Sequence, residues 1–167
     1  PILVAELVIH KDPDADPSAT FSMEDYSHGE APWNQPVGGM TPRYDSIFIA
    51  SGVTGIGDYA FQGMDTVTKV TIQDPSTLKR VGAHAFEGDD KLEGPLDISG
   101  VTELGEAAFQ NCSALGEVTL GEGLTEIPKN AFNNCGLQKI EIPAGVETIG
   151  ESAFASNSFS AQGALVL

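Results

Sequence analysis

Apolar residues recur along most of the chain at a fixed spacing, and the recurrence is clearest around the dipeptide Ala-Phe. Ala-Phe occurs five times at intervals of 22 to 25 residues, and apolar residues stand seven and four positions before each Ala. The copies are Ala60-Phe61, Ala85-Phe86, Ala108-Phe109, Ala131-Phe132 and Ala153-Phe154. A period in this range is typical of tandem repeats whose units stack as the coils of a solenoid.

Each unit also contains a short run in which apolar and polar residues alternate, as in Val70 with Ile72 or Leu96 with Ile98. Such alternation predicts one strand per unit with one buried face. The other residues of the unit, roughly eighteen, must return the chain to the next strand, and their Gly, Pro, Asn and Asp residues favour turns. There is room for one helical turn around Ala-Phe but not for a crossover helix. We therefore expect strands one period apart to stack in parallel.

Several segments of this unit resemble the BspA-like leucine-rich repeat of bacterial cell-surface proteins. The clearest is the run Gly52-Val53-Thr54-Gly55-Ile56-Gly57-Asp58-Tyr59-Ala60-Phe61, and Asn111-Cys112 and Asn134-Cys135 fall where that family has Asn-Cys. The likeness runs from about Ser46 to Phe154. It implies a strand-dominated leucine-rich repeat solenoid of the α/β class, with a parallel concave β-sheet and short turns or single helical turns on the convex side.

The sequence departs from this family pattern at a few places. Asp65 and Asp89 lie near positions where the family has Cys, Pro128 replaces a Gly, and a two-residue insertion follows Ile72. These departures leave the shape of the loops open and do not change the predicted fold.

The chain divides into two predicted parts. Residues 1–45 do not repeat, whereas residues 46–167 hold about five repeats with a degenerate unit at the C-terminal end. An uncovered solenoid end is an aggregation edge, so we expect residues 1–45 to cap the first coil, with Trp33 and Phe21 packed against it. A separate ligand-binding role for this region is the alternative.

Composition and charge restrict the partners. The 167 residues include 24 acidic and 8 basic side chains, a net charge of −16, which argues against nucleic acid or an anionic membrane as a partner. No apolar run is long enough to cross a membrane, and the segment that begins at Pro1 has no secretion signal, although the chain could begin after one. The resemblance implies an extracellular or bacterial cell-surface location.

Two groups of residues suggest metal chemistry. Asp12, Asp14 and Asp16 have the alternate spacing that begins a calcium loop, but Pro17 and Met23 stand where that loop needs Gly and Glu. We favour an acidic turn and keep a weak calcium site as the alternative. The three histidines, His10, His28 and His84, show no metal-ligand spacing, so neither a metal nor a cofactor is predicted.

Cys112 and Cys135 are one period apart and should lie over one another in neighbouring coils. The spacing of stacked strands permits a disulfide without requiring it, and we favour two buried thiols. Neither Cys has a histidine base beside it, and no nucleophile elbow or phosphate-binding loop is present, so an enzyme is not expected.

The remaining candidate site is the exposed side of the strands. Outward residues should form rows on the concave side, where repeat proteins usually bind partners, although the same residues also suit a plain soluble strand. The predicted surface consists of Phe48, Lys69, Thr71, Asp97, Glu117, Thr119, Lys139 and Glu141. The leading hypothesis is a noncatalytic extracellular module for adhesion or recognition that binds a protein or possibly a glycan. A structural spacer within a larger surface protein is the alternative.

Overall fold

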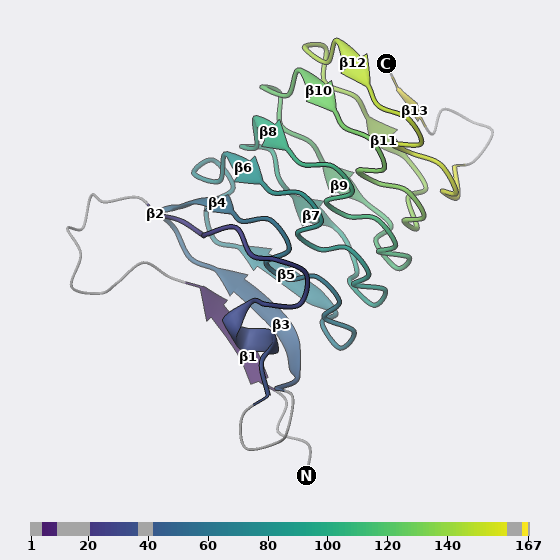
Figure 1. Ribbon diagram of the computed structural model, residues 1–167. Helices are drawn as coiled ribbons and strands as arrows, with labels where there is room; N and C mark the ends of the chain where they lie inside the picture. Colours follow the sequence, from purple (N-terminus) through teal and green to yellow (C-terminus); the bar gives the residue numbers. More distant parts are fainter. Residues whose placement is uncertain (1–4, 10–20, 37–41, 160–164, 167) are drawn as a thin grey trace.

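A computed structural model describes residues 5–9, 21–36, 42–159 and 165–166, and within them the chain winds into a solenoid of parallel strands. Two lines of strands run along the stack (Figure 1). The first line is β1 (Ala5–Ile9), β3 (Tyr44–Ile49), β5 (Lys69–Ile72), β7 (Leu96–Asp97), β9 (Val118–Thr119), β11 (Ile140–Glu141) and β13 (Leu165–Val166). The second line is β2 (Phe21–Ser22), β4 (Val53–Ile56), β6 (Arg80–Val81), β8 (Glu103–Leu104), β10 (Glu126–Ile127) and β12 (Thr148–Ile149).

We number the coils by their strands. Coil 1 contains β3 and β4, coil 2 contains β5 and β6, coil 3 contains β7 and β8, coil 4 contains β9 and β10, and coil 5 contains β11 and β12. Each paired strand runs parallel to its partner one coil away, as when Ile47 of β3 lies opposite Val70 of β5. The predicted parallel-strand solenoid of about five coils is confirmed.

The prediction of one strand per unit was wrong, because every coil has two. The second strand precedes the Gly or Pro that follows the repeated Ile, and it pairs in parallel with its equivalent, as Val81 of β6 does with Leu104 of β8. The repeated apolar residues around these second strands are three positions apart, as Leu78 and Val81 are, so they lack the alternation that marked the first strand line.

Turns, and not helical turns, carry the Ala-Phe pairs. The only helix in the described part of the chain is a 3-10 helix at Pro32–Asn34. In the turn of coil 1, the N–H groups of Tyr59, Phe61 and Gly63 donate to the carbonyl oxygens of the next coil at 2.8–2.9 Å. Three equivalent bonds join each later pair of coils up to coil 5. These N–H groups bind the neighbouring coil, so they are not available for the hydrogen bonds within a helix.

These turns also explain the Asn of the Asn-Cys pairs. Two residues after each Phe the backbone takes positive φ, at Gly63, Gly88, Asn111, Asn134 and Ser156. Gly and Asn tolerate this left-handed conformation better than most residues do. The repeat therefore places Asn or Gly at that point in four of the five coils.

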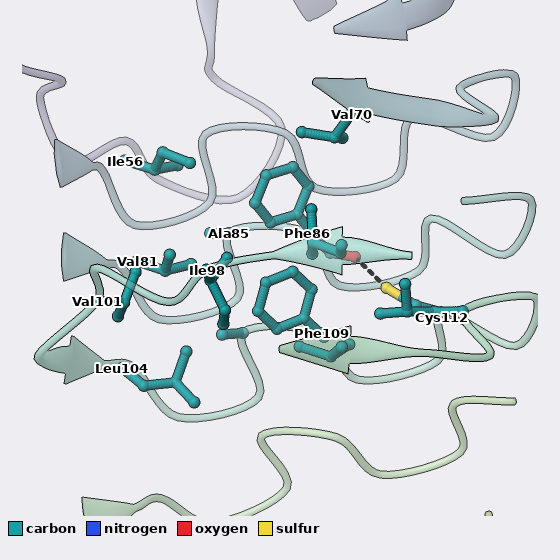
Figure 2. Close-up of a cluster of buried hydrophobic side chains, with 14 of the residues drawn as sticks. Ile56, Val70, Val81, Ala85, Phe86, Ile98, Val101, Leu104, Phe109 and Cys112 are labelled. Atoms are coloured by element: carbon teal, nitrogen blue, oxygen red, sulfur yellow. Dashed lines mark hydrogen bonds between the residues drawn. The ribbon is translucent and has the colours of Figure 1, made fainter. Parts of the chain in front are cut away.

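The phenylalanines of the five Ala-Phe pairs form one continuous internal column. Neighbouring rings lie 5.1–5.6 Å apart, centroid to centroid. The first four phenylalanines are at most 1% exposed, and Phe154 is half-buried. Figure 2 shows Phe86 and Phe109 stacked between the side chains of Ile98 and Cys112. The shared period thus lays each ring on the ring of the neighbouring coil.

The Gly that directly follows β4, β6, β8 and β12 lies where neighbouring coils approach closely. A Cβ atom at Gly105 would lie 2.2 Å from the backbone nitrogen of Ala83, and one at Gly82 would lie 2.5 Å from that of Asp58. Neither residue has positive φ, so turn geometry alone does not explain it. Pro128 occupies the same place in coil 4 and accepts the equivalent hydrogen bond from Ala131 N–H at 3.2 Å, so the turn keeps its shape there.

Residues before the repeats pack on the first coil as another layer. β1 and β2 pair in parallel with β3 and β4. The Trp33 ring stacks on Phe61 at 5.4 Å between centroids, and its Nε1–H donates to the carbonyl oxygen of Ala60 at 2.7 Å. The predicted contact of Trp33 with the first coil is confirmed. The prediction for the Phe21 side chain lies outside what the structure describes, and the capping role of residues 1–45 stays a proposal.

One arginine ties this N-terminal layer to coils 1, 2 and 3. Arg80 of β6 contacts Asp25 at 2.8 Å, Asp58 at 2.7 Å and Glu103 at 3.5 Å. The backbone N–H of Asp58 donates to Asp25 Oδ1 at 2.9 Å. That hydrogen bond, followed by the one from Arg80, lowers the pKa of the Asp25 carboxyl.

Candidate interaction surface

The exposed side of the first strand line, which we call the sheet face, carries the predicted surface residues. Phe48 lies opposite Thr71, and Asp97 lies opposite Thr119. Their chain neighbours, such as Ile47 and Val118, are buried in the core. Of the eight predicted surface residues, two are half-buried, Phe48 and Thr71. The other six are exposed: Lys69, Asp97, Glu117, Thr119, Lys139 and Glu141. The structure therefore places all eight at the surface, and their role in binding stays a prediction.

The sheet face also contains a residue that sequence reasoning missed. Val8 of β1 lies opposite Phe48 and is 45% exposed, an unusual state here for a large apolar side chain. Because Val8 lies outside the repeat, no period gives its partner strand or its register. Val8 and Phe48 form an apolar pair at the N-terminal end of the sheet face, beside polar residues such as Glu6 and Lys69.

The ladder of the sheet face is interrupted between coils 2 and 3, and also between coils 4 and 5, where β9 and β11 belong to different sheets. β5 is the last strand of one sheet and β7 the first of the next. The N–H groups of Leu96 and Ile98 donate to carbonyl oxygens beside and within β9, at 3.0 Å each. Successive N–H groups of a strand point to opposite sides, so the residues directly before Leu96 and Ile98 direct their N–H positions toward β5. Pro95 is one of those residues and has no N–H to donate. The two-residue insertion after Ile72 lies in coil 2, directly after β5.

The C-terminal half of the sheet face is hollowed and mainly acidic. A shallow hollow of about 380 Å³ lies over β9 and β11. Its polar lining includes Glu117, Glu122, Lys139 and Glu141, and the Lys139 ammonium lies 3.8 Å from the Glu117 carboxylate. Both side chains of this ion pair are more than half exposed, so it contributes little to stability and leaves both charges accessible. This half of the face therefore presents three carboxylates against one ammonium.

The two cysteines are free and buried, as the sequence analysis favoured. Cys112 Sγ donates to the carbonyl oxygen of Phe86 and Cys135 Sγ to that of Phe109, at 3.0 Å each. Burial raises the pKa of Cys112 well above its usual value and that of Cys135 to about 12. Buried thiols that stay protonated are poor nucleophiles.

The histidines in the described part of the chain take part in side-chain packing. The His84 ring stacks on Tyr59 at 4.7 Å, and its Nδ1 lies 2.8 Å from Glu87 Oε2. The His28 ring meets Tyr59 edge-on at 6.4 Å. No group of three or more His, Cys, Asp or Glu that could hold a metal occurs in the ranges that the structure describes. His10 and the predicted calcium alternative at Asp12, Asp14 and Asp16 lie outside them.

Comparison with known families decides the classification of this fold. The sequence profile of the BspA type leucine rich repeat region matches residues 40–160 in six copies. The chain belongs to this family. The resemblance noted from Gly52 to Phe61 and at the two Asn-Cys pairs is thereby confirmed. No match was found among curated proteins.

Three solved structures of bacterial proteins are similar to this chain, and the first of them is described as a leucine-rich repeat protein. One, from Eubacterium ventriosum, is 28% identical over 70% of this chain and 31% of its own, with a TM-score of 0.58. A leucine rich cell surface protein from Faecalibacterium prausnitzii is 25% identical over 93% of this chain and 48% of its own, with a TM-score of 0.61. The pneumococcal vaccine antigen PcpA is 22% identical over 92% and 38%, with a TM-score of 0.71, and supports the fold alone. The chain spans a third to a half of the lengths of these proteins.

Search of the described residues for a long apolar helix that could cross a membrane finds none.

Proposed function

We propose that this chain is a noncatalytic, extracellular module of a bacterial surface protein, and that it binds a protein partner on the sheet face. The observation that carries the proposal is the exposed residue row that continues through successive coils beside a buried row of Ile, Val and Leu. Membership of the leucine-rich repeat family and the likeness to a leucine rich cell surface protein support this role and location. Adhesion or recognition is the form of binding that we propose.

The chemistry of the sheet face favours a protein over a glycan. Val8 and Phe48 offer apolar contact at one end, and Asp97, Glu117 and Glu141 offer carboxylates toward the other. A basic protein segment with apolar side chains matches both halves, and charge complementarity of this kind speeds association and selects partners. A glycan-binding surface would be expected to present several aromatic rings, and Phe48 is the one aromatic residue among the eight predicted.

The test is a binding screen with charge-reversed variants. The chain is immobilised and probed with arrays of purified extracellular proteins and of glycans. The test variant combines Lys69→Glu, Glu117→Lys and Glu141→Lys. The control combines Lys129→Glu, Glu106→Lys and Glu151→Lys, three exposed residues outside the first strand line, with the same net change in charge.

We expect saturable binding of at least one protein, weakened at least tenfold by the test variant and unchanged by the control. Equal binding by all three forms would contradict the assignment of the sheet face. Saturable binding of glycans alone would contradict the protein partner.

A structural spacer is the second candidate, and the continuity of the coils favours it. Backbone hydrogen bonds join the Ala-Phe turns from coil 1 to coil 5 without a break, which couples the coils in one stiff array. A spacer predicts no saturable binding to either array, while the chain still holds a fused reporter domain away from the surface to which it is anchored.

A further inference from the structure

The third residue after each Phe occupies an equivalent place in successive coils, buried in coils 1 to 4 and half-buried in coil 5. In three coils its side chain donates a hydrogen bond to the Phe carbonyl oxygen of the preceding coil. Figure 2 shows the bond from Cys112 Sγ to the carbonyl oxygen of Phe86, 3.0 Å long. The other two run from Cys135 Sγ to Phe109 O at 3.0 Å and from Asn157 Nδ2 to Phe132 O at 2.7 Å. A side-chain donor at this position therefore ties each of these coils to the one before it.

Asp89 occupies this position in coil 2 and faces coil 1. Its side chain is fully buried, and its Oδ1 accepts the N–H of Met64 at 2.8 Å. The other oxygen, Oδ2, is buried without a hydrogen-bond partner. Within the described part of the chain, no donor is bonded to the carbonyl oxygen of Phe61, the acceptor that corresponds to Phe86, Phe109 and Phe132.

An ionised carboxylate does not fit this place. A carboxylate only accepts hydrogen bonds, so it cannot supply the donor that the Phe61 carbonyl needs. An ionised Asp89 would instead bury a charge and leave two acceptors without a donor, its own Oδ2 and the carbonyl oxygen of Phe61. The buried charge and each unpaired oxygen cost free energy. A carboxylic acid has one O–H donor and one accepting oxygen, which are the two functions that Asn157 supplies in coil 5 through Nδ2 and Oδ1.

We propose that Asp89 is a proton-binding site built into the solenoid: the folded chain holds it as the neutral acid, and its Oδ2–H donates to the carbonyl oxygen of Phe61. The proton is taken from solvent when the chain folds at neutral pH and is returned when the chain unfolds. Asp89 thereby replaces the thiol and amide donors of the other coils and links coil 2 to coil 1.

The groups around Asp89 support retention of the proton. Burial is the largest influence and raises its pKa well above the usual value for an aspartic acid. The nearby carboxylates of Asp90, in the same turn, and Asp65, in coil 1, raise the pKa further, whereas the hydrogen bond from the Met64 N–H and the proximity of the Gly63 N–H lower it. The Cys112 thiol, on the coil 3 side, is uncharged at neutral pH because burial raises its own pKa.

The proton makes the stability of coils 1 and 2 dependent on pH in an unusual direction for an aspartate. The pKa of Asp89 is higher in the folded chain than in the unfolded one, so its contribution is fully present below the unfolded value of 3.8. That contribution is lost as the pH rises toward the folded value. The Asp25 carboxyl, whose pKa is lowered by folding, has the opposite dependence.

Urea unfolding of three forms across pH tests the proposal. Asp89→Asn keeps both hydrogen bonds without a titrating proton, and Asp90→Asn removes an exposed neighbouring charge as the matched control. We expect the unfolding equilibrium constant of the wild type, divided by that of Asp89→Asn, to rise up to tenfold per pH unit above about pH 4. The division cancels the titration of the groups that both proteins share. The proposal would be overturned if this ratio stayed constant to about pH 8. It would also be overturned if the ratio of wild type to Asp90→Asn rose with pH as steeply as the ratio of wild type to Asp89→Asn.

Infrared spectroscopy tests the proton itself and does not depend on the stability of the variant. The wild type at neutral pH should show the carbonyl band of a protonated carboxylic acid, shifted by deuteration and absent from Asp89→Asn. If that variant does not fold, Asp89→Cys, which copies the donor of coils 3 and 4, takes its place. A folded wild type without this band at neutral pH would overturn the proposal.

Discussion

Coils 3 and 4 repeat one another closely, whereas coils 1 and 2 keep the same backbone with different side chains. The rings of Phe86, Phe109 and Phe132 stack with planes within 4° of parallel. At the N-terminal end the Phe61 plane is tilted by 28° from Trp33 and by 29° from Phe86. The buried position after Asn or Gly is Cys in coils 3 and 4, but Met64 in coil 1 and Asp89 in coil 2.

The comparison shows that the backbone hydrogen bonds between coils are common to both regions, whereas the buried side chains of the repeat differ between them. The three hydrogen bonds between neighbouring Ala-Phe turns are the same in both regions. The turn therefore keeps the same backbone hydrogen bonds whether the third residue after Phe is Cys, Asp or Met, provided that the side chain fills the buried place. Coils 3 and 4 share identical rings and thiols, whereas coils 1 and 2 also contact the N-terminal layer, through Trp33 and through the ion pair of Arg80 with Asp25.

The largest effect is expected from a cavity in the regular region. Phe109→Ala removes a fully buried ring that stacks on two neighbours, and we expect a loss of about 4 kcal/mol in the free energy of unfolding. Phe154→Ala, in the half-buried last ring, should cost about half as much. Urea unfolding measures both. Equal losses would show that the column does not depend on neighbours on both sides.

A smaller loss is expected at the N-terminal end of the column. Trp33→Ala removes a half-buried ring and the hydrogen bond to Ala60, and should lower the free energy of unfolding by about 2 kcal/mol. Trp33→Phe keeps the stacking and loses only the bond, so it should cost about 1 kcal/mol. If neither variant differed from the wild type in thermal unfolding, the N-terminal layer would not cover coil 1.

The next effect concerns the donors of coils 3 and 4. Cys112→Ala leaves the Phe86 carbonyl without its side-chain donor and leaves a small cavity, so we expect a loss of about 1–2 kcal/mol. The thiols should also resist alkylation in the native protein and react once it unfolds, because burial raises their pKa values. Rapid native alkylation, followed by mass spectrometry, would contradict their burial.

The smallest effect is electrostatic and lies in the N-terminal layer. Asp25 is exposed, so Asp25→Asn should cost less than about 1 kcal/mol at neutral pH. Because folding lowers the pKa of Asp25, the difference from the wild type should disappear as the pH falls below the unfolded value of 3.8. Thermal unfolding across pH measures it. A difference that persists at lower pH would mean that Asp25 acts through packing and not through charge.

The repeat period predicted the stacking of the coils, because side chains at matching positions of one period must occupy matching places in a regular solenoid. The Phe column, the Cys positions and the outward residues of the first strand line all followed from that argument. The second strand line did not, because its repeated apolar residues, such as Leu78 and Val81, are three positions apart and do not alternate. The hydrogen bonds between turns are made by backbone groups, which the side-chain pattern does not encode.

The candidate surface was predictable where the repeat supplies a register and not elsewhere. Val8 lies outside the repeat, so only the structure aligned it with Phe48. The departure of Asp89 from the Cys of the repeat was visible in the sequence. The consequence of this departure could not be predicted, because the sequence does not show that the side chain at this position donates to a Phe carbonyl oxygen. The hydrogen bonds of Cys112, Cys135 and Asn157 in the other coils show it.

The most direct test of the account is the deletion of one complete coil from the middle of the stack. Removal of residues 105–127 takes out 23 residues, which is one period. Leu104 then precedes Pro128 in place of Ile127, the residue at the equivalent position of the next coil. We predict a strand-type circular dichroism spectrum and cooperative unfolding at a lower stability, while removal of residues 105–115 alone leaves the chain largely unfolded. Loss of structure in the first deletion, or equal folding of both, would contradict the claim that each period forms one coil supported by its neighbours.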